Sequence, residues 1–300
     1  MRNAFVNTII SWSQNNPAPF LITGDLGYSV LEPFRDKYPD SFINTGIMEQ
    51  SMVSFGAGLS LNSSKPVFLY SINNFITFRA LEQLRLDIGY HSLGICIVGV
   101  GAGFQYKSSG YSHWGIEDLA AVASLEKFKI SVPADSAGVI SEVEDFLNFP
   151  KPTYLRLGNI HNELPKSADF KYISGVRLFG TGNKFICVHG NIASDLLNNQ
   201  RYDPLKHSIL VFDKIPPYDS PEFIRILEHS DDITVVEEVV YSGSLGSRFA
   251  KIISELNLDI HFKWVGIRGE MIGTSGGDIE FLRRRMFGEN YGEIIFNAPE

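Results

Sequence analysis

The sequence predicts an α/β protein with two three-layer domains, each built on a mostly parallel sheet, and three observations support this prediction. Short apolar runs rich in β-branched residues alternate with longer segments that carry apolar residues at helical spacing, a pattern typical of parallel strands joined by helices. The length of 300 residues is about twice the usual size of one domain. A polar, irregular stretch from residue 160 to about residue 180 separates two such alternating series.

The first series predicts six strands joined by helices. The strands are the runs FLITGD (20–25), SFINTG (41–46), KPVFLYSI (65–72), LGICIVGVG (93–101), FKISVP (128–133) and PTYLRL (152–157). The spacing of apolar residues predicts helices at 49–61, 75–90, 115–125 and 135–147. The last of these can be N-capped by Asp135 or Ser136, and it must end before Pro150.

The second series predicts a second, smaller α/β domain. Its strands are the runs KFICVHG (184–190), SILVFDK (208–214), ITVVEEV (233–239) and IHFKWVGI (260–267). We place the boundary between residues 168 and 169, so the predicted domains are 1–168 and 169–300.

Composition excludes several classes of function. The formal net charge is −8 and no run of Lys and Arg forms a basic face, which argues against binding to nucleic acid or to an anionic membrane. Cys96 and Cys187 each lie in an apolar run and are expected to be buried thiols rather than disulfide partners or metal ligands. No run of 18 apolar residues occurs, so we expect a soluble, cytoplasmic protein.

A single acidic residue begins a predicted helix in the segment INTGIMEQSMVSFGAGLSL (43–61). The positive end of the helix dipole favours such a carboxylate at many helices, so Glu49 alone indicates no function. The same helix carries Gly56 and Gly58. Glycine in a helix interior costs about 1 kcal/mol relative to alanine, so its presence points to close packing.

The part of this segment from 45 to 61 resembles the stretch that carries the activating glutamate in the pyrimidine-binding domain of transketolases. Three further segments occur in the order that this family uses: GDLGYSVLEPF (24–34), FITFRALEQLRLDIGYH (75–91) and GYSHWGIEDLAAVASLEKFKISVPAD (110–135). The resemblance covers about residues 1–160. More weakly, ITVVEEVVYSGSLGS (233–247) is similar to the transketolase C-terminal domain. The chain therefore resembles the C-terminal subunit of a split, thiamine-diphosphate-dependent transketolase.

The resemblance implies that Glu49 activates the cofactor. A carboxylate hydrogen-bonded to the aminopyrimidine ring favours the tautomer that lets the reactive carbon ionise. The family pattern places an aromatic stacking partner at Phe75, with Phe78 close by, and puts Asp25 near the cofactor and the partner interface. The alternative from the residues alone is that the two phenylalanines belong to the core and that Asp25 caps a helix.

Two further residues match substrate-binding positions of the family. His113 lies in a loop rich in Gly and Ser and corresponds to a histidine that binds substrate hydroxyls or moves protons, which makes it a second catalytic candidate. Arg156 ends a predicted strand and corresponds to an arginine that holds a substrate phosphate, a role that its planar fork suits. Without the resemblance, both would be ordinary surface residues.

The loop before His113 departs from the family pattern. The family's sugar-recognition loop carries a histidine where this chain has Gly101 and an acidic residue where it has Ser109. The loop instead offers Gln105, Tyr106 and Lys107. We therefore expect a donor other than an ordinary ketose phosphate.

A second departure concerns the diphosphate. Enzymes of this cofactor class hold it through Mg²⁺ on a GDG motif followed by an asparagine, because the metal needs oxygen ligands while it bridges phosphate oxygens. No GDG occurs in this chain. We therefore predict an N-terminal transketolase-like partner that carries the motif and most of the Mg²⁺ and thiamine-diphosphate site, in an α2β2 assembly.

The implied function is transfer of a two-carbon ketol unit between sugar or sugar-phosphate substrates. Alternatives within the cofactor class are the beta-type subunit of a 2-oxo-acid dehydrogenase and a decarboxylating enzyme similar to deoxyxylulose-phosphate synthase. A non-catalytic scaffold with the same fold is the alternative outside it.

Overall fold

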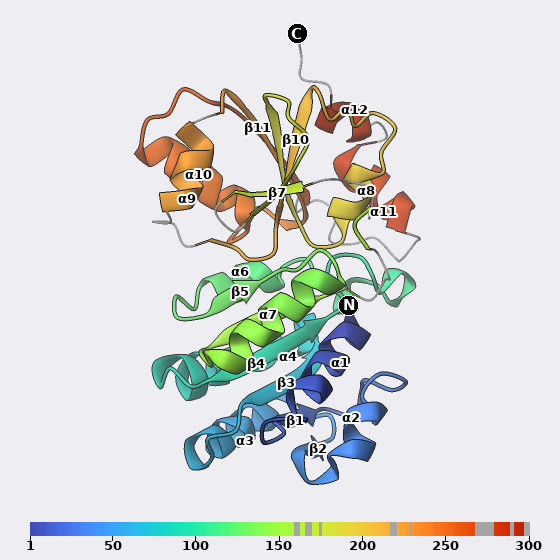
Figure 1. Cartoon of the computed structure of the whole chain (residues 1–300), viewed down its shortest axis with the longest axis vertical. Helices are drawn as coiled ribbons and strands as arrows, with labels where there is room; N and C mark the ends of the chain where they lie inside the picture. Colours follow the sequence, from blue (N-terminus) through green and yellow to red (C-terminus); the bar gives the residue numbers. More distant parts are fainter. Residues whose placement is uncertain are drawn as a thin grey trace.

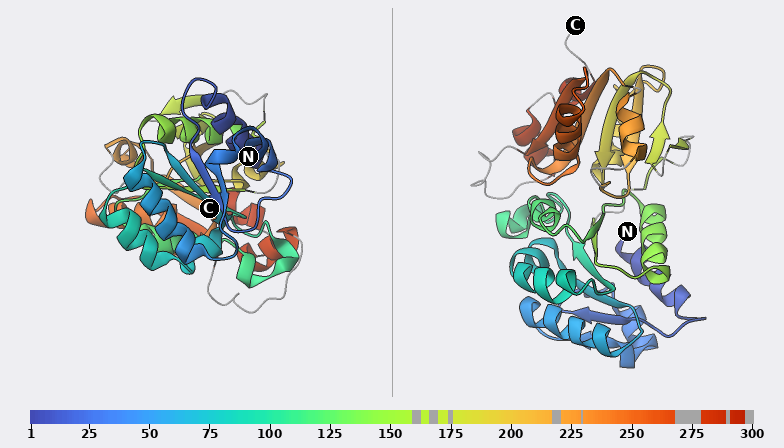
Figure 2. Two further views of the ribbon diagram at one scale, coloured as in Figure 1. Left: turned by 90° about the horizontal axis from the view of Figure 1, so that it is seen from below. Right: turned by 90° about the vertical axis from the view of Figure 1, so that its left-hand side faces the viewer.

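The chain folds into two stacked α/β units, each with a six-stranded sheet. In this computed structural model, residues 1–158, 163–165, 170–173, 176–216, 221–228, 230–267, 279–288 and 291–296 are described. The first unit occupies the lower part of Figure 1 and the second the upper part, and Figure 2 shows the same stacking from the side. The predicted α/β class is confirmed. The predicted boundary between residues 168 and 169 lies outside the described residues and stays a prediction.

The first sheet is parallel throughout its described strands, in the order β2-β1-β3-β4-β6-β5. The strands are β1 (Phe20–Thr23), β2 (Phe42–Asn44), β3 (Val67–Ile72), β4 (Ile95–Val100), β5 (Lys129–Ser131) and β6 (Thr153–Leu157). All six lie within the runs predicted from the sequence. The chain passes from β1 to β2 on one side and then crosses back to β3 on the other side of β1, so the strand order reverses at β1.

Helices cover both faces of this sheet. They are α1 (Arg2–Trp12), α2 (Glu32–Lys37), α3 (Glu49–Asn62), α4 (Asn73–Phe78), α5 (Leu81–Gln83), α6 (Asp118–Ala123) and α7 (Ser136–Asn148). Helices α1 and α7 pack against each other over one face, and α3 and α4 pack on β3 over the other. Along β3, Phe68 and Tyr70 enter the core under α1 and α7, whereas Val67 and Leu69 enter the opposite core, as alternation along a strand requires.

The second sheet has the order β12-β11-β9-β10-β8-β7. Its strands are β7 (Phe170–Ile173), β8 (Val176–Phe179), β9 (Lys184–His189), β10 (His207–Phe212), β11 (Asp232–Val240) and β12 (His261–Ile267). Its described helices are α8 (Ile192–Leu197), α9 (Pro221–Glu228), α10 (Leu245–Glu255), α11 (Ile279–Phe287) and α12 (Tyr291–Phe296). The sequence predicts four of these strands. It does not predict the antiparallel edge formed by β7 and β8, because that stretch reads as irregular.

Two helix predictions need correction and two are confirmed, since the helix predicted over 49–61 is α3 (Glu49–Asn62). The stretch predicted as one helix over 75–90 consists of α4, α5 and a π-helical segment, Leu84–Tyr90, because Ala80 leaves the helical conformation with φ −118° and ψ 19°. The helix predicted over 115–125 begins only at Asp118. Helix α7 starts as predicted, with the Asp135 carboxylate accepting the N–H of Gly138 at 2.8 Å.

A backbone hydrogen bond and buried ion pairs join the two units. The N–H of Ile215 donates to the carbonyl of Ile130 at 2.9 Å, so the edge strand β5 gains a neighbour from the second unit. Buried Arg177 on β8 lies 2.8 Å from the carboxylate of Asp135 and 2.7 Å from that of Asp213. Both cysteines are buried free thiols. Within the described residues, no helix is long and apolar enough to cross a membrane.

Candidate functional site

Glu49 lies at the carboxyl edge of the first sheet, where β2 ends and α3 begins. Its side chain is only 4% exposed, although Ile47 and Met48 before it are largely exposed. The carboxyl edge next to a reversal of strand order is where ligands bind in open α/β sheets. The N-terminus of α3 also favours a negative charge at this place. Sheet topology and helix direction together put a buried carboxylate at the expected ligand crevice.

One guanidinium engages both Glu49 and Phe75. Nη1 of Arg79 donates to both carboxylate oxygens of Glu49, at 3.0 and 3.1 Å. The Cζ atom of the same guanidinium lies 3.7 Å from the centroid of the Phe75 ring. The side chain of Arg79 is 46% exposed, so it reaches the carboxylate from the solvent side. Sequence reasoning does not identify Arg79, because an arginine in a helical segment reads as a solvated side chain.

His113 joins the same group of side chains. Its ring lies 5.1 Å from the ring of Phe75 and 5.8 Å from that of Tyr106, edge to face in both cases. Its Nδ1 lies 2.9 Å from the hydroxyl of Ser112. We call Glu49, Phe75, Arg79, Tyr106 and His113 the Glu49 cluster. The structure thus brings together three predicted site residues, Glu49, Phe75 and His113, from separate segments.

Tyr106 explains why the loop after β4 carries a glycine. Gly101 has φ +91°, and a Cβ built there would lie 2.0 Å from the Tyr106 ring. No side chain fits at residue 101 while Tyr106 keeps its place. The indole N–H of Trp114 donates to the carbonyl of Lys107 at 2.8 Å and holds the loop beside His113. The aromatic ring that fills this space belongs to Tyr106, five residues further along the chain. The absence of the family's histidine at residue 101 does not by itself identify Tyr106.

Asp25 follows β1 in a tight polar turn. It has φ +57° and accepts hydrogen bonds from the hydroxyl of Tyr28 at 2.6 Å and the amide of Asn44 at 3.4 Å. The hydrogen bond from Tyr28 and then that from Asn44 lower the pKa of Asp25. The side chain is exposed, and both of these partners lie outside the Glu49 cluster. Asp25 therefore braces the turn between the ends of β1 and β2.

The two predicted aromatic partners differ in their surroundings. Phe75 is partly buried and contacts both Arg79 and His113. Phe78 is 48% exposed. With Ile47 and Met48, it leaves apolar surface exposed close to Glu49 and Phe75 along the chain.

Arg156 is buried, not open to a ligand. Its side chain is 3% exposed, its Nε lies 2.9 Å from Asp118, and its Nη2 donates to the carbonyl of Gly115 at 2.5 Å. The hydroxyl of Tyr154 and the amide of Asn73 also donate to Asp118, at 2.5 and 2.8 Å. This brace fixes Gly115, two residues after His113. The phosphate-binding role of Arg156 stays a prediction, and a phosphate would have to displace these contacts.

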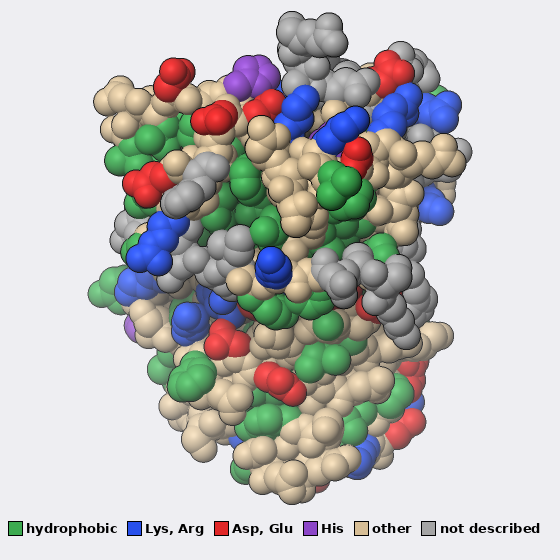
Figure 3. Space-filling view, turned by 45° about the horizontal axis from the view of Figure 1, so that its top comes forward, with side chains coloured by type: hydrophobic (Ala, Val, Ile, Leu, Met, Phe, Trp, Pro, Cys, Tyr) green, Lys and Arg blue, Asp and Glu red, His purple; other side chains and the backbone are tan. Residues whose placement is uncertain are grey.

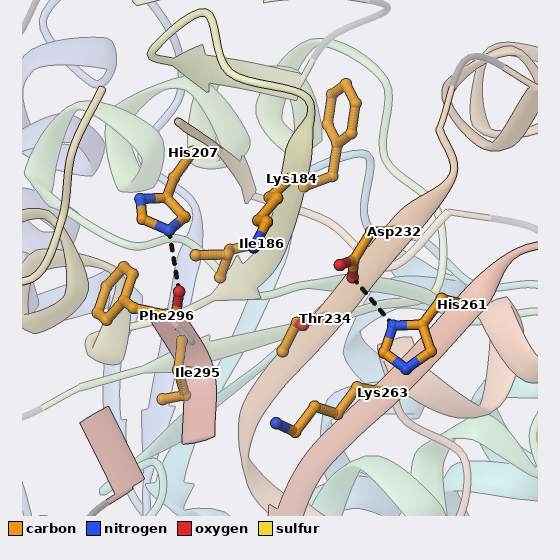
Figure 4. A pocket seen from close by; sticks show the side chains of 10 residues that line it. Lys184, Ile186, His207, Asp232, Thr234, His261, Lys263, Ile295 and Phe296 are labelled. Atoms are coloured by element: carbon orange, nitrogen blue, oxygen red, sulfur yellow. Dashed lines mark hydrogen bonds and ion pairs between the residues drawn. The ribbon is translucent and has the colours of Figure 1, made fainter. Parts of the chain in front are cut away.

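Two cavities in other parts of the molecule are lined by ionisable side chains, many of which are paired within the chain. The small one in Figure 4, of about 10 Å³, lies at the amino ends of strands of the second sheet. Its histidines are engaged, since His207 contacts the carbonyl of Phe296 at 3.1 Å and His261 lies 3.4 Å from Asp232. We assign it no ligand.

A groove at the junction of the units has a basic lining. Its cations are Lys127, Lys129, Lys151, Lys214, Arg248 and Lys251. Figure 3 shows Lys and Arg side chains close together between the two halves, on the left. Much of this charge is compensated within the chain, because Lys129 pairs with Glu142 and Asp145 and Lys251 lies 3.7 Å from Glu255. We assign this groove no ligand either.

The comparison with known families agrees with the position of the cluster. Residues 1–161 match the family described as transketolase, pyrimidine binding domain. The chain belongs to this transketolase family. All five residues of the Glu49 cluster lie within the matched range.

Individual relatives extend the similarity over the second unit. The chain is 27% identical to one subunit of the apulose-4-phosphate transketolase of Phocaeicola vulgatus, covering 90% of this chain and 88% of that protein. It is 24% identical to the 6-deoxy-6-sulfo-D-fructose transketolase subunit SqwH of a Clostridium species, covering 100% and 94%. A solved structure described as a split gene transketolase, inactive beta4 tetramer, matches with a TM-score of 0.76 at 26% identity, covering 89% of each chain.

Thiamine diphosphate is the cofactor that the transketolase family implies, and the Glu49 cluster fits its aminopyrimidine part. The carboxylate of Glu49 is buried and accepts hydrogen bonds from the flat guanidinium of Arg79. The same guanidinium lies over the face of the Phe75 ring. A ring nitrogen donor needs the same acceptor and the same aromatic face. Within the described residues, no group of three or more His, Cys, Asp or Glu side chains is arranged to hold a metal ion.

Replacing Asp118 with Asn tests the brace behind His113. The variant leaves the buried guanidinium of Arg156 without its countercharge, so the free energy of unfolding should fall by about 3–5 kcal/mol. Chemical denaturation of the chain measures this, and Asp36→Asn, which affects an exposed pair with Arg35, should stay within about 0.5 kcal/mol.

The difference in free energy of unfolding between the wild type and Asp118→Asn should depend on pH. Burial alone would raise the pKa of Asp118, but Arg156, Tyr154 and Asn73 hold it below its ordinary value of 3.8. Its contribution is therefore present above pH 3.8 and is lost as the pH falls through the lower folded-state value. The stability difference between the wild type and Asp118→Asn should shrink over that acid range, and a difference independent of pH would contradict the assignment.

Proposed function

We propose that the chain is the cofactor-activating C-terminal subunit of a split transketolase, which transfers a two-carbon ketol unit between sugar or sugar-phosphate substrates. The observation that carries this proposal is a buried carboxylate, Glu49, grouped with Phe75 and His113 within the residues that match a transketolase pyrimidine-binding domain. Relatives over nearly the whole length are named as transketolase subunits, which supports the same function.

Glu49, Phe75 and His113 each have a distinct task in this proposal. Thiamine diphosphate supplies the electron sink that makes cleavage of a carbon–carbon bond possible. Glu49 accepts a hydrogen bond from the aminopyrimidine ring and holds or releases its proton. Phe75 orients the ring through its face, and His113, beside it, binds a substrate hydroxyl or moves a proton there. Phe78 contributes exposed apolar surface next to the site, and Asp25 braces the turn before it.

The proposal includes a partner chain. No GDG motif occurs in the sequence, so the Mg²⁺ and diphosphate ligands would come from an N-terminal transketolase-like subunit, in an α2β2 assembly. Apolar Ile47, Met48 and Phe78 are exposed in the sequence around Glu49 and Phe75 and supply surface for such a contact. The related split gene transketolase in the form described as a beta4 tetramer is inactive, which supports a need for the second subunit.

The donor is proposed to differ from an ordinary ketose phosphate. Tyr106 fills the space beside Gly101 and contacts His113, so no imidazole can stand at residue 101. Ser109 is exposed and uncharged. The dehydrogenase-type and synthase-type alternatives use the same activated cofactor and differ in the donor, so this part of the site separates them. A scaffold function is disfavoured by the grouping of Glu49, Phe75 and His113.

Glu49→Gln, assembled with the N-terminal subunit, tests the central residue. The amide cannot hold and release the ring's proton, so turnover should fall by about 10²–10⁴-fold. Exchange of the proton on the cofactor's reactive carbon, followed by NMR, should slow in parallel, while the assembly measured by size exclusion is unchanged. The control is Glu255→Gln, an exposed carboxylate on α10. Wild-type exchange in Glu49→Gln would remove the proposal.

The partner requirement is tested by titrating thiamine diphosphate and Mg²⁺ into the isolated chain and into the two-subunit assembly, with calorimetry as the measurement. The isolated chain should show no saturable binding, because its sequence lacks the motif for the diphosphate. The assembly should bind with one cofactor for each Glu49. Tight binding and turnover by the isolated chain would contradict this prediction.

The donor is tested with a panel of ketose phosphates and 2-oxo acids given to the assembly. Because Tyr106 occupies the space beside Gly101, xylulose 5-phosphate should be a poor donor, with the loss mainly in kcat/KM. Tyr106→Ala should change KM for the best donor more than kcat, since the ring shapes the pocket and exchanges no proton in this proposal. Robust turnover of xylulose 5-phosphate by the wild type would rule out an altered donor.

A further inference from the structure

Arg79 makes the two contacts that the proposed function assigns to the cofactor's aminopyrimidine ring. It donates to both carboxylate oxygens of Glu49 at 3.0 and 3.1 Å, and its guanidinium lies over Phe75 with Cζ 3.7 Å from the ring centroid. A guanidinium is flat, delocalised and rich in N–H donors, and it stacks on aromatic rings. It thus resembles an aminopyrimidine in its flat shape and in its N–H donors, although it has no acceptor nitrogen.

We propose that Arg79 occupies the place where the aminopyrimidine would bind and must swing out before the cofactor binds there. A heterocycle cannot use the carboxylate of Glu49 and the same face of Phe75 while the guanidinium lies between them. Arg79 is then an internal competitor of the cofactor. The inference rests on the proposed function, because it takes Glu49 and Phe75 as the residues that receive the ring.

Burial and charge explain why the chain keeps such an occupant. The side chain of Glu49 is 4% exposed, and a buried carboxylate without a countercharge or hydrogen-bond donor is costly. Arg79 supplies both. The arginine therefore stabilises the fold where a buried carboxylate without a partner would destabilise it.

Exposure explains why Arg79 can leave. Its side chain is 46% exposed, whereas Arg156, which pairs with Asp118, is 3% exposed. Arg79 follows the last residue of α4, and Ala80 breaks the helical conformation immediately after it. A long side chain anchored at a helix end on the solvent side can turn into water without disturbing the core. Arg156 has no such path.

The expected consequence is that removing Arg79 tightens cofactor binding. Binding to the wild-type assembly must first break the ion pair and the stacking contact. Arg79→Ala should therefore lower the Kd for thiamine diphosphate by about tenfold. This factor corresponds to the combined free energy of one partly exposed ion pair and one cation–π contact. Arg79→Lys keeps the charge and loses the flat guanidinium, so its Kd should lie between the two.

The experiment is a calorimetric titration of thiamine diphosphate, at fixed Mg²⁺, into assemblies that contain wild type, Arg79→Ala, Arg79→Lys or Arg201→Ala. Arg201 is the matched control, because it is 50% exposed and pairs with Glu293 in the second unit, outside the Glu49 cluster. The isolated Arg79→Ala chain should also melt at a lower temperature than the wild type, because Glu49 loses its countercharge. Arg201→Ala should change neither the Kd nor the melting temperature.

The outcomes separate this inference from the proposed function. A higher Kd in Arg79→Ala would mean that the arginine holds the cofactor, and an unchanged Kd would mean that it does not compete, and either overturns the inference while the proposed function stands. Absence of binding in every assembly would remove the proposed function and the inference with it. Arg79→Lys keeps the test valid if Arg79→Ala fails to fold.

Discussion

A carboxylate buried at the open end of a parallel sheet needs a positive partner, and much of the site follows from that need. The burial of Glu49 arises from the fold, because β2 ends and α3 begins at the carboxyl edge, where the strand order reverses next to β1. The helix dipole supplies only part of the compensation, of the order of 0.3–1 kcal/mol. A hydrogen-bond donor with a positive charge must supply the rest, and that donor is Arg79.

A second constraint keeps His113 beside Phe75. The loop from Gly101 to Gly115 contains two short 3-10 turns, Lys107–Ser109 and Tyr111–His113, and side-chain contacts fix it further. Trp114 holds its middle through the carbonyl of Lys107, and Arg156 holds its end through the carbonyl of Gly115. Since Arg156 is itself fixed by Asp118, a buried ion pair positions a loop that reaches the surface. The ion pair of Arg156 and Asp118 thus affects the position of His113 through the backbone at Gly115.

The sequence predicts most of the strands because each is a short apolar run between turn residues, and runs of that kind have few alternatives in a parallel sheet. It does not predict β7 and β8, because both have only four residues and β7 carries the exposed side chains Phe170 and Tyr172. The contact of Phe75 with His113 joins residues far apart in the chain, and only the family resemblance relates them. Arg79 could not be predicted, because its role depends on a distance to Glu49 that helical spacing does not fix.

Assembly and activation are physically linked if the partner covers the surface around Glu49. The exposed side chains of Ile47, Met48 and Phe78 gain free energy when they leave water, at roughly 25 cal/mol per Å². The same burial would remove water from the solvent side of Arg79. Arg79 could then either stay in a drier site, where its pair with Glu49 is stronger, or turn toward a new acceptor and leave the carboxylate to the cofactor. Under the proposed function the second state is the one that cofactor binding requires, so the proposed partner would supply an acceptor for the displaced guanidinium as well as the ligands of the diphosphate.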